Sequence, residues 1–311
     1  MLSIMVPGPL AMLQDMGVVG YQSAGFPQTG AADKDALRKA NLLVGNAQNE
    51  ACIEMVLMGI TTYFTKAAVI AITGADIAPQ LNWEPIPMNR AIAVKKGDTF
   101  TSSYAKSGCR AYFAIAGGFD VPRVMGSKST NLKLKTGGFE GRKLRTGDLL
   151  PYQEISLPPE TLAKRSIAAA PYDKQVTLRV VLGPQENAFT ENGMNIFLSS
   201  EYLVDPNSDR MGIRLKGEAV ESQNGTDIIS DGIAYGSVQI PANGQPIILG
   251  ADRQTTGGYV KIATVITRDM PKTAQLKPGD AVRFAAISVK EAQKLYKAYE
   301  KEMRALAKRF Q

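Results

Sequence analysis

Histidine is absent from the 311-residue sequence. Without imidazole, the chain by itself cannot form a Ser-His-Asp or Cys-His nucleophile pair, a histidine-ligated zinc site or an imidazole general base. Any catalysis must therefore use carboxylates, lysine, tyrosine, hydroxyls, arginine or backbone amides, or a base that a partner chain supplies. We assign no metal site.

Cysteine and long apolar runs are also scarce. Cys52 and Cys109 are too few for a disulfide framework, and we interpret both as small buried hydrophobic residues of a protein from a reducing compartment. The most apolar internal run, residues 67–72, is far shorter than a membrane span. The opening segment has no Lys or Arg before its apolar residues and is broken by Pro-Gly-Pro at 7–9, unlike a secretory signal. We therefore expect a cytoplasmic protein.

Short apolar runs bounded by Gly, Pro or Asp predict a mainly β protein with few helices. These runs are residues 67–72, 111–116, 176–182 and 247–249. Helical periodicity is confined to residues 33–44 and to the C-terminus. The last helix is expected to begin with a capping box formed by Ser288 and Glu291. Its apolar stripe consists of Leu295, Tyr299, Met303, Leu306 and Phe310.

A Gly-Asp turn recurs three times before an apolar run, at residues 96–98, 146–148 and 278–280. Glycine supplies the positive φ of such a turn, and the aspartate accepts hydrogen bonds from nearby amides. The recurrence indicates two similar barrel-like modules in tandem, separated by a proline-containing segment. We predict an N-terminal module over 1–157, a linker over 158–174, a C-terminal module over 175–287 and an amphipathic helix over 288–311.

The net charge of +7 is distributed unevenly. Residues 123–145 carry +6 and residues 288–311 carry +4, whereas the rest of the chain sums to −3. In the terminal helix the basic residues alternate with Glu300 and Glu302, which is typical of a solvated outer face. The sequence has no zinc-finger spacing, RNP-like strand or aromatic-basic alternation, so we do not predict nucleic-acid binding.

Two polar, glycine-rich stretches of the N-terminal half are candidate functional loops. The first, residues 21–33, ends at Asp33, which is both a candidate catalytic carboxylate and the expected N-cap of the following helix. The second spans residues 116–141. Its Gly117-Gly118 pair would expose amides to an anion, although two glycines alone are a weak signal.

A third stretch, residues 208–215, contains two arginines. If the apolar residues of this stretch share one face of a strand, Arg210 and Arg214 share the other face and form a carboxylate clamp beside Asp209. The alternative is a structural Asp–Arg pair. The residues alone leave both interpretations open.

The fourth stretch, residues 250–261, is the richest in functional groups and follows an apolar strand. Periodicity does not require this composition, so we interpret it as a binding or catalytic loop in which the glycines let the backbone approach a ligand. Its candidate catalytic residues are Asp252, Thr255 and Thr256. Its candidate binding residues are Arg253, Gln254, Gly258, Tyr259 and Lys261.

These motifs together resemble the biotin-dependent carboxyltransferase family, also called allophanate hydrolase subunit 2-like, over nearly the whole chain. The similar segments are Pro7-Gly8-Pro9, Gln14-Asp15, residues 25–33, 40–46, 116–130 and 137–142, Ser208 to Gly212, Gln239-Ile240-Pro241, residues 244–246 and Ala251 to Tyr259. Members often carry histidine where this chain has Ser23 and Gln223, so no role of those histidines transfers to it.

The resemblance implies two tandem cyclophilin-like β-barrel modules and an obligate subunit-B-like partner in a heterodimer or heterotetramer, with the active site where the two proteins meet. It is strongest toward the C subunits of bacterial 5-oxoprolinases. Those subunits act with A and B subunits and ATP to hydrolyse 5-oxo-L-proline to L-glutamate, so we expect a hydrolase subunit that is inactive alone. One alternative is biotin-dependent carboxyl transfer to urea or a related amide. Another is a non-catalytic partner that antagonises a kinase-inhibitor-like B subunit.

Under the hydrolase interpretation, each candidate residue has an expected role based on its chemistry. Arginines 210, 214 and 253 would hold the substrate carboxylate or a phosphate, and Asp252 or Asp33 would transfer a proton. Thr255, Thr256 and Gly258 would donate to a developing oxyanion. The remaining substrate-binding candidates are Gln239, Gln254, Tyr259 and Lys261.

Overall fold

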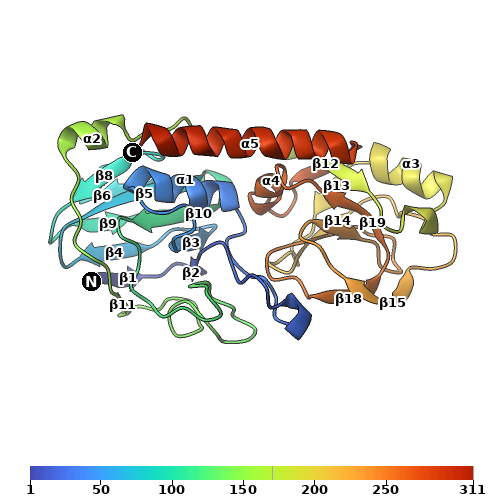
Figure 1. The fold of residues 1–311 in the computed structure, drawn as a ribbon, viewed down its shortest axis with the longest axis horizontal. Helices are drawn as coiled ribbons and strands as arrows, with labels where there is room; N and C mark the ends of the chain where they lie inside the picture. Colours follow the sequence, from blue (N-terminus) through green and yellow to red (C-terminus); the bar gives the residue numbers. More distant parts are fainter. Residues whose placement is uncertain (170, 311) are drawn as a thin grey trace. The chain divides into compact units, whose positions relative to one another are not determined.

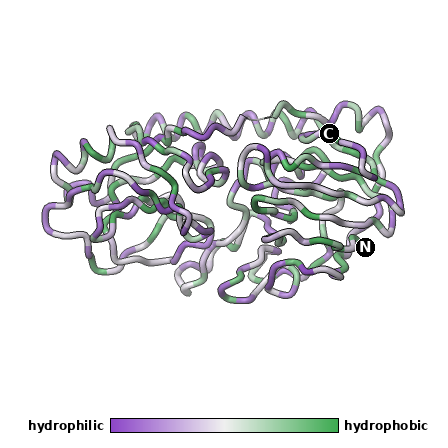
Figure 2. Tube along the Cα trace, turned by 180° about the vertical axis from the view of Figure 1, so that it is seen from behind, coloured by the Kyte–Doolittle hydropathy of each residue, from purple (hydrophilic) through white to green (hydrophobic). Residues whose placement is uncertain are grey.

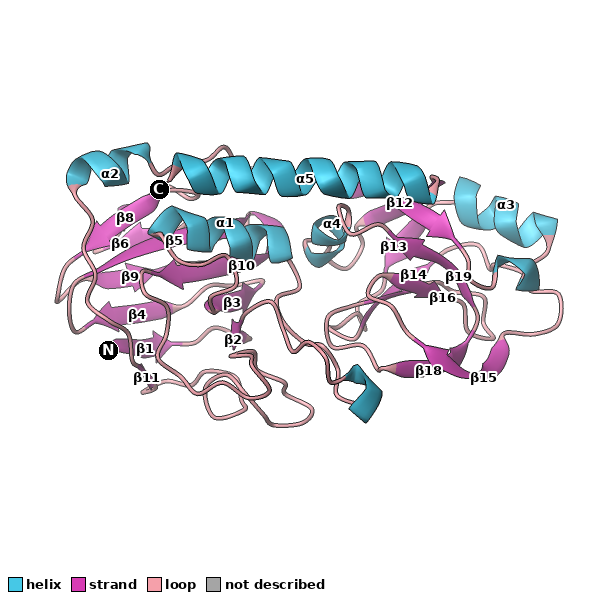
Figure 3. Cartoon of the chain, in the orientation of Figure 1, coloured by secondary structure: helices cyan, strands magenta, loops and turns pink. Residues whose placement is uncertain are grey.

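β-Strands dominate the structure, as the sequence predicts (Figure 3). The computed structural model describes residues 1–169 and 171–310, which divide into two compact units. The first unit comprises Met1–Val19, Thr29–Tyr172 and Arg304–Gln311, and the second comprises Gly20–Gln28 and Asp173–Met303. The chain therefore passes from the first unit to the second within the segment 158–174, which also contains the short helix α2 (Pro159–Lys164).

The first unit consists of two antiparallel sheets (Figure 1). The six-stranded sheet has the order β11 (Leu149–Leu150), β1 (Leu2–Val6), β4 (Thr61–Phe64), β9 (Thr99–Thr101), β6 (Gln80–Leu81) and β7 (Glu84–Pro85). The five-stranded sheet has the order β2 (Ala11–Gln14), β3 (Cys52–Val56), β10 (Ser107–Ile115), β5 (Ala68–Asp76) and β8 (Ala91–Val94). Apolar side chains of both sheets form one core, in which Phe113 contacts the rings of Phe64 and Phe100.

Helix α1 (Lys34–Val44) confirms the helix expected at residues 33–44 and packs against β5 and β10. Asp33 is its N-cap, and its Oδ1 accepts a hydrogen bond from the amide of Ala36 at 2.9 Å. The helix ends at Gly45, whose φ of 83° is left-handed. Both cysteines are buried thiols, as predicted.

The second unit contains a closed seven-stranded barrel (Figure 1). Its strands, in order, are β12 (Gln175–Leu182), β19 (Lys261–Val265), β16 (Ser237–Gln239), β17 (Ile247–Leu249), β14 (Gly212–Lys216), β13 (Tyr202–Val204) and β20 (Ala281–Ala286). β12 and β20 pair in parallel and close the barrel. A separate antiparallel pair of strands, β15 (Asp227–Gly232) and β18 (Thr256–Tyr259), contains residues 256–259 of the fourth polar stretch.

Short helices complete the second unit. They are η1 (Gln22–Ala24), η2 (Glu186–Ala188), α3 (Glu191–Ser199) and α4 (Met270–Ala274). Phe197 of α3 stacks on Phe284 of β20 with ring centroids 4.4 Å apart. Tyr202 lies beside the same phenylalanine at 5.9 Å. These rings form one end of the barrel core.

The three Gly-Asp turns share one geometry. Gly97, Gly147 and Gly279 all have φ between 86° and 98°. In each turn the aspartate carboxylate accepts a hydrogen bond from the amide three residues earlier, at 2.7 to 2.8 Å. The turns lead into β9, β11 and β20 respectively. The predicted turn chemistry is therefore confirmed, with two copies in the first unit and one in the second.

The C-terminal helix α5 (Val289–Arg309) begins with the predicted capping box. The Glu291 amide donates to Ser288 Oγ at 3.2 Å, and the Ser288 amide donates to Glu291 Oε2 at 3.0 Å. Within the apolar stripe, Tyr299, Met303 and Phe310 are buried. Figure 2 shows polar and apolar residues alternating along this helix. All seven basic residues of segment 288–311 are exposed, which confirms the solvated face.

Asp269, just before α4, is a buried carboxylate that joins this helix to the barrel. Its side chain is 1% exposed and accepts hydrogen bonds from the Arg179 guanidinium at 2.6 and 2.8 Å and from the Arg179 amide at 2.9 Å. Burial alone raises the pKa of Asp269, but the hydrogen bonds from Arg179 outweigh burial and hold the pKa below its ordinary value.

The lowered pKa of Asp269 predicts a pH-dependent contribution to stability. A carboxyl with a lowered pKa in the folded state stabilises the fold fully above its unfolded pKa of about 3.9. That contribution is lost as the pH falls through the folded pKa. We expect Asp269→Asn to lower the free energy of unfolding at pH 7, and the difference from wild type to shrink below about pH 4. Urea unfolding at a series of pH values measures this, and a difference that is constant down to the lowest pH would contradict it.

Candidate functional site

The fourth polar stretch does not form one loop in the structure. After β17, residues 250–255 make a turn, Thr256–Tyr259 form β18, and the chain then enters the barrel at β19. Lys261 is the first residue of β19 and therefore lies in a barrel strand. This change of sheet within a few residues brings the polar groups of β18 next to buried residues of the barrel.

Lys261 is a buried cation. Its side chain is 2% exposed, and its Nζ donates to Asp231 Oδ2 at 3.0 Å. The Lys261 amide donates to Gln185 Oε1 at 3.0 Å. The hydrogen bond from Lys261 lowers the pKa of Asp231 below its ordinary value. The Asp231 side chain is 57% exposed, so the buried ammonium group of Lys261 has a counter-ion that contacts solvent.

The amide groups of Gln239 and Gln254 lie close to Gly257 of β18. Gln239 is directly opposite Lys261 in the pairing of β16 with β19, where the register shifts by a bulge. The buried Gln239 donates through Nε2 to the carbonyl of Tyr259 at 3.3 Å. A Cβ built on Gly257 would lie 2.9 Å from Gln239 Nε2 and 3.2 Å from Gln254 Nε2. Glycine at 257 therefore lets both amide groups approach the β18 backbone.

Arg210 and Asp252 form a bidentate ion pair. Arg210 Nε donates to one carboxylate oxygen of Asp252 at 2.8 Å, and Nη2 donates to the other at 3.0 Å. The two side chains are 7% and 15% exposed. Asp209, the neighbour that the sequence suggested, instead accepts hydrogen bonds from the amides of Met211 and Gly212. Arg214 is exposed on β14, so the two arginines of the expected clamp occupy different environments.

Arg253 connects the fourth stretch with the first. This 3% exposed side chain donates to the carbonyl of Ile233 at 3.2 Å and to Gln28 Oε1 at 3.4 Å. Its guanidinium lies 5.4 Å from the centroid of the Tyr235 ring. Burial lowers the pKa of Arg253 below its ordinary value. Gln28 thus joins the site from a segment more than two hundred residues away in the sequence.

The remaining candidates of this stretch lie at the surface of the second unit. Gln254, Thr256 and Tyr259 are exposed, and Thr255 and Gly258 are partly exposed. Thr255 accepts a backbone hydrogen bond from Ile233. The segment therefore combines two kinds of group. Its cations, Arg253 and Lys261, are buried, whereas its hydroxyl, phenol and amide groups are at the surface.

Asp33 lies in the first unit, within a network that the sequence analysis missed. The Asp33 amide donates to the hydroxyl of Tyr112 at 2.8 Å, and that hydroxyl donates to Glu54 Oε2 at 2.6 Å. Burial and the nearby Glu54 and Asp33 raise the pKa of Tyr112 well above its ordinary value. Glu54 and Tyr112 sit opposite each other in β3 and β10, within strands whose apolar pattern gave no sign of a polar pair.

In the second glycine-rich stretch, the amides of Gly117 and Gly118 are not exposed to an anion as the sequence predicted. The amide of Gly117 donates to Asn46 Oδ1 at 2.8 Å and that of Gly118 to the carbonyl of Ile115 at 3.0 Å, so these amides are occupied and do not await an anion. Further along, the buried Asp15 accepts hydrogen bonds from both the Ser127 and Ser129 hydroxyls, at 2.6 and 2.5 Å. This carboxylate fixes the start of the basic loop.

Within residues 1–169 and 171–310, no group of three or more Cys, Asp or Glu side chains is arranged to hold a metal ion. Over the same residues, no helix combines the length and apolarity that crossing a bilayer requires.

Comparison with known sequences and structures identifies the family of this chain. Residues 24–286 match the family model described as carboxyltransferase domain, subdomain A and B. The 5-oxoprolinase C subunit of Escherichia coli is 37% identical over 99% of this chain and 98% of its own length, and that of Haemophilus influenzae is 37% identical over 93% and 92%. The urea carboxylase structure from Kluyveromyces lactis superposes with a TM-score of 0.90 at 29% identity, covering 98% of this chain and 29% of that chain.

Proposed function

The chain belongs to the carboxyltransferase family defined by subdomains A and B, and on that premise we propose that it is the C subunit of an ATP-dependent 5-oxoprolinase. In this proposal it acts with A and B subunits in the hydrolysis of 5-oxo-L-proline to L-glutamate. The observation that carries the proposal is the 37% identity to the C subunit of an E. coli 5-oxoprolinase across almost the full length of both chains.

The proposed reaction needs two features that the second unit offers. 5-Oxoproline carries a carboxylate and a stable lactam, so its site requires a fixed cation and donors directed at the lactam carbonyl. Lys261 and Arg253 supply buried positive charge. The amides of Gln239 and Gln254 lie together above Gly257 and are suited to the carbonyl. We assign these four residues to substrate binding.

The Arg210–Asp252 pair has a positioning role in this proposal. Because both oxygens of Asp252 accept from Arg210, the pair holds the turn that connects β17 to β18. Thr255, Thr256 and Tyr259 follow that turn at the surface and remain our candidates for groups that meet substrate or the partner subunit. Asp33 remains a candidate for proton transfer, although its carboxylate caps α1 and only its backbone amide reaches the Tyr112 hydroxyl.

ATP enters the proposal as a co-substrate of the whole complex. Transfer of its γ-phosphoryl group to the lactam oxygen would activate the carbonyl carbon toward water. After water adds, the ring C–N bond would break with the protonated nitrogen as leaving group, and a second water would hydrolyse the resulting acyl phosphate to glutamate and phosphate. The buried cations described above would stabilise the negative charge of the resulting phosphoryl group.

The test is reconstitution of the chain with companion A and B subunits from the same genome. We expect 5-oxoproline-dependent release of ADP and glutamate with all three proteins, and neither product when this chain is omitted. A complete mixture without activity would refute the proposal.

A second candidate is biotin-dependent carboxyl transfer, which the match to a urea carboxylase structure favours. It predicts urea- or amide-dependent turnover only when a biotinylated carrier protein and its carboxylase are supplied. Activity in that mixture, together with none in the 5-oxoproline mixture, would replace the first proposal. Tight binding to the B subunit without either activity would favour a regulatory role.

A further inference from the structure

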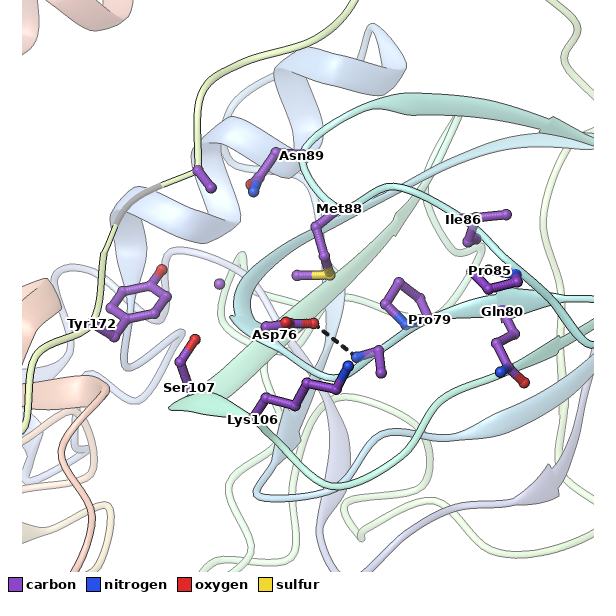
Figure 4. A pocket seen from close by; sticks show the side chains of 13 residues that line it. Asp76, Pro79, Gln80, Pro85, Ile86, Met88, Asn89, Lys106, Ser107 and Tyr172 are labelled. Carbon is purple, nitrogen blue, oxygen red and sulfur yellow. Dashed lines mark hydrogen bonds between the residues drawn. The ribbon is translucent and has the colours of Figure 1, made fainter.

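The first unit contains a polar hollow that has no part in the site described above. It has a volume of about 510 Å³, within the range of small-molecule sites. It lies where β5 ends and β10 begins (Figure 4). There the register shifts, because the four steps from Ser107 to Ala111 face only the two steps from Asp76 to Gly74. This bulge lies at the end of the paired strands, where Asp76, Lys106 and Ser107 line the hollow.

One acidic and one basic side chain line this hollow without pairing with each other. Asp76 uses Oδ1 to accept a hydrogen bond from the amide of Ala78 at 2.9 Å, which leaves its other oxygen available. Lys106 immediately precedes β10, the strand that pairs with β5, and is exposed. Over residues 1–169 and 171–310, its ammonium group has no hydrogen bond or ion pair with another side chain. The hollow therefore offers both charges to a ligand.

Neutral donors and an apolar wall accompany the two charges. Ser107 and Tyr172 contribute hydroxyl groups, and Met88 and Ile86 contribute apolar surface (Figure 4). Burial and the nearby charges of Asp33 and Asp35 raise the pKa of Tyr172, so its hydroxyl stays protonated and can donate.

The backbone around the hollow is strained in two places. Ala78 has a φ of 46° and Asn89 a φ of 59°, in the left-handed region that residues other than glycine rarely adopt. Asn89 is held there by hydrogen bonds from its amide to Ile72 and to its carbonyl from Ile167. Strain that the surrounding structure maintains clusters at ligand sites. These two residues belong to different segments of the lining.

We propose that this hollow binds a free α-amino acid as a zwitterion. The ligand ammonium group pairs with Asp76, its carboxylate pairs with Lys106 and accepts from the Ser107 and Tyr172 hydroxyls, and its side chain lies against Met88 and Ile86. A ligand with both charges satisfies both unpaired groups at once, whereas a simple anion or cation would leave one charge of the hollow uncompensated. The inference is independent of the reaction proposed for the second unit.

The test uses the full chain and begins with saturation-transfer NMR against each of the twenty L-amino acids. The tightest binder is then titrated calorimetrically beside its N-acetyl derivative, which lacks the ammonium charge, and its amide, which lacks the carboxylate. We expect each derivative to bind about tenfold or more weakly than the amino acid. No saturable binding below about 10 mM for any amino acid would overturn the proposal.

Two variants test the individual contacts. Asp76→Asn keeps an acceptor for the Ala78 amide, so we expect a folded protein that binds the amino acid about tenfold or more weakly and its N-acetyl derivative unchanged. Lys106→Met should weaken binding of the amino acid by a similar factor and leave the affinity for the amide derivative unchanged. Lys96→Met, at an exposed turn of the same unit, is the matched control and should bind like wild type. Equal losses for amino acid and derivative in both variants would overturn the assignment of the two charges.

Discussion

Replacement of Asp252 by alanine is expected to destabilise the second unit by about 3–5 kcal/mol, because it removes the carboxylate to which both Nε and Nη2 of the buried Arg210 guanidinium donate. The side chain of Arg210 is only 7% exposed, so water cannot replace the lost carboxylate without local opening. The free energy of urea unfolding measures the loss. Hydrogen exchange should localise it to β17 and β18, which flank the turn that the pair holds, and to β14, which follows Arg210. Strands β5 and β10 of the first unit should stay protected.

An exposed ion pair in the same barrel provides the matched control. Arg283 and Glu201 lie 3.2 Å apart, with side chains 50% and 37% exposed. Glu201→Ala should cost at most about 1 kcal/mol, the usual limit for a surface pair. If Asp252→Ala cost no more than Glu201→Ala, the Arg210–Asp252 pair would have no structural role.

The double variant Arg210→Met with Asp252→Leu separates charge pairing from packing. Substitution of a buried ion pair by apolar residues of similar volume is often neutral or stabilising. We therefore expect the double variant to recover most of the stability that Asp252→Ala loses. In the cycle formed by wild type, Arg210→Met, Asp252→Leu and the double variant, the changes in the free energy of unfolding should be strongly non-additive. An additive result would mean that the two side chains act independently despite their bidentate geometry.

Features with a local cause were predictable from the sequence. The capping box of Ser288 and Glu291, the N-cap at Asp33 and the three Gly-Asp turns each depend on residues within a few positions of one another. The mainly β architecture follows from short apolar runs, and the structure confirms it. Such signals survive folding because the interactions that cause them form within one turn of the chain.

Pairings between distant segments were not predictable in the same way. The sequence marked Arg210 and Asp252 separately, but their contact depends on how β14 and β17 pair in the barrel. Gln185 and Asp231 were missed because each lies in a segment without unusual composition. Gln28 lies in the first candidate loop, but nothing in that loop pointed to Arg253, and only the fold brings these residues to Arg253 or Lys261. The prediction that Gly117 and Gly118 bind an anion was wrong, because the Gly117 amide donates to the distant side chain of Asn46, which the sequence could not show.

Replacement of Lys261 by methionine is the second large effect that we expect, and it concerns activity. Under the proposed function, the reconstituted complex should lose about 10²- to 10³-fold in kcat/KM for 5-oxoproline, the usual effect of removing one directed donor from a polar site. Methionine keeps the unbranched apolar stem in its buried position, and the exposed Asp231 keeps its contact with water. The free energy of unfolding should therefore change by less than about 1.5 kcal/mol.

The contrast between activity and stability is what makes Lys261→Met informative. Lys216 lies in the same barrel and pairs with Asp205 at 2.6 Å, but its side chain is 69% exposed. Lys216→Met removes the same charge from the surface, so its complex should keep wild-type turnover. If both variants retained turnover, Lys261 would be a structural cation and the substrate carboxylate would have to be held elsewhere. If Lys261→Met instead unfolded the barrel, its pairing with Asp231 would be structural, and Asp231→Asn should then unfold it as well.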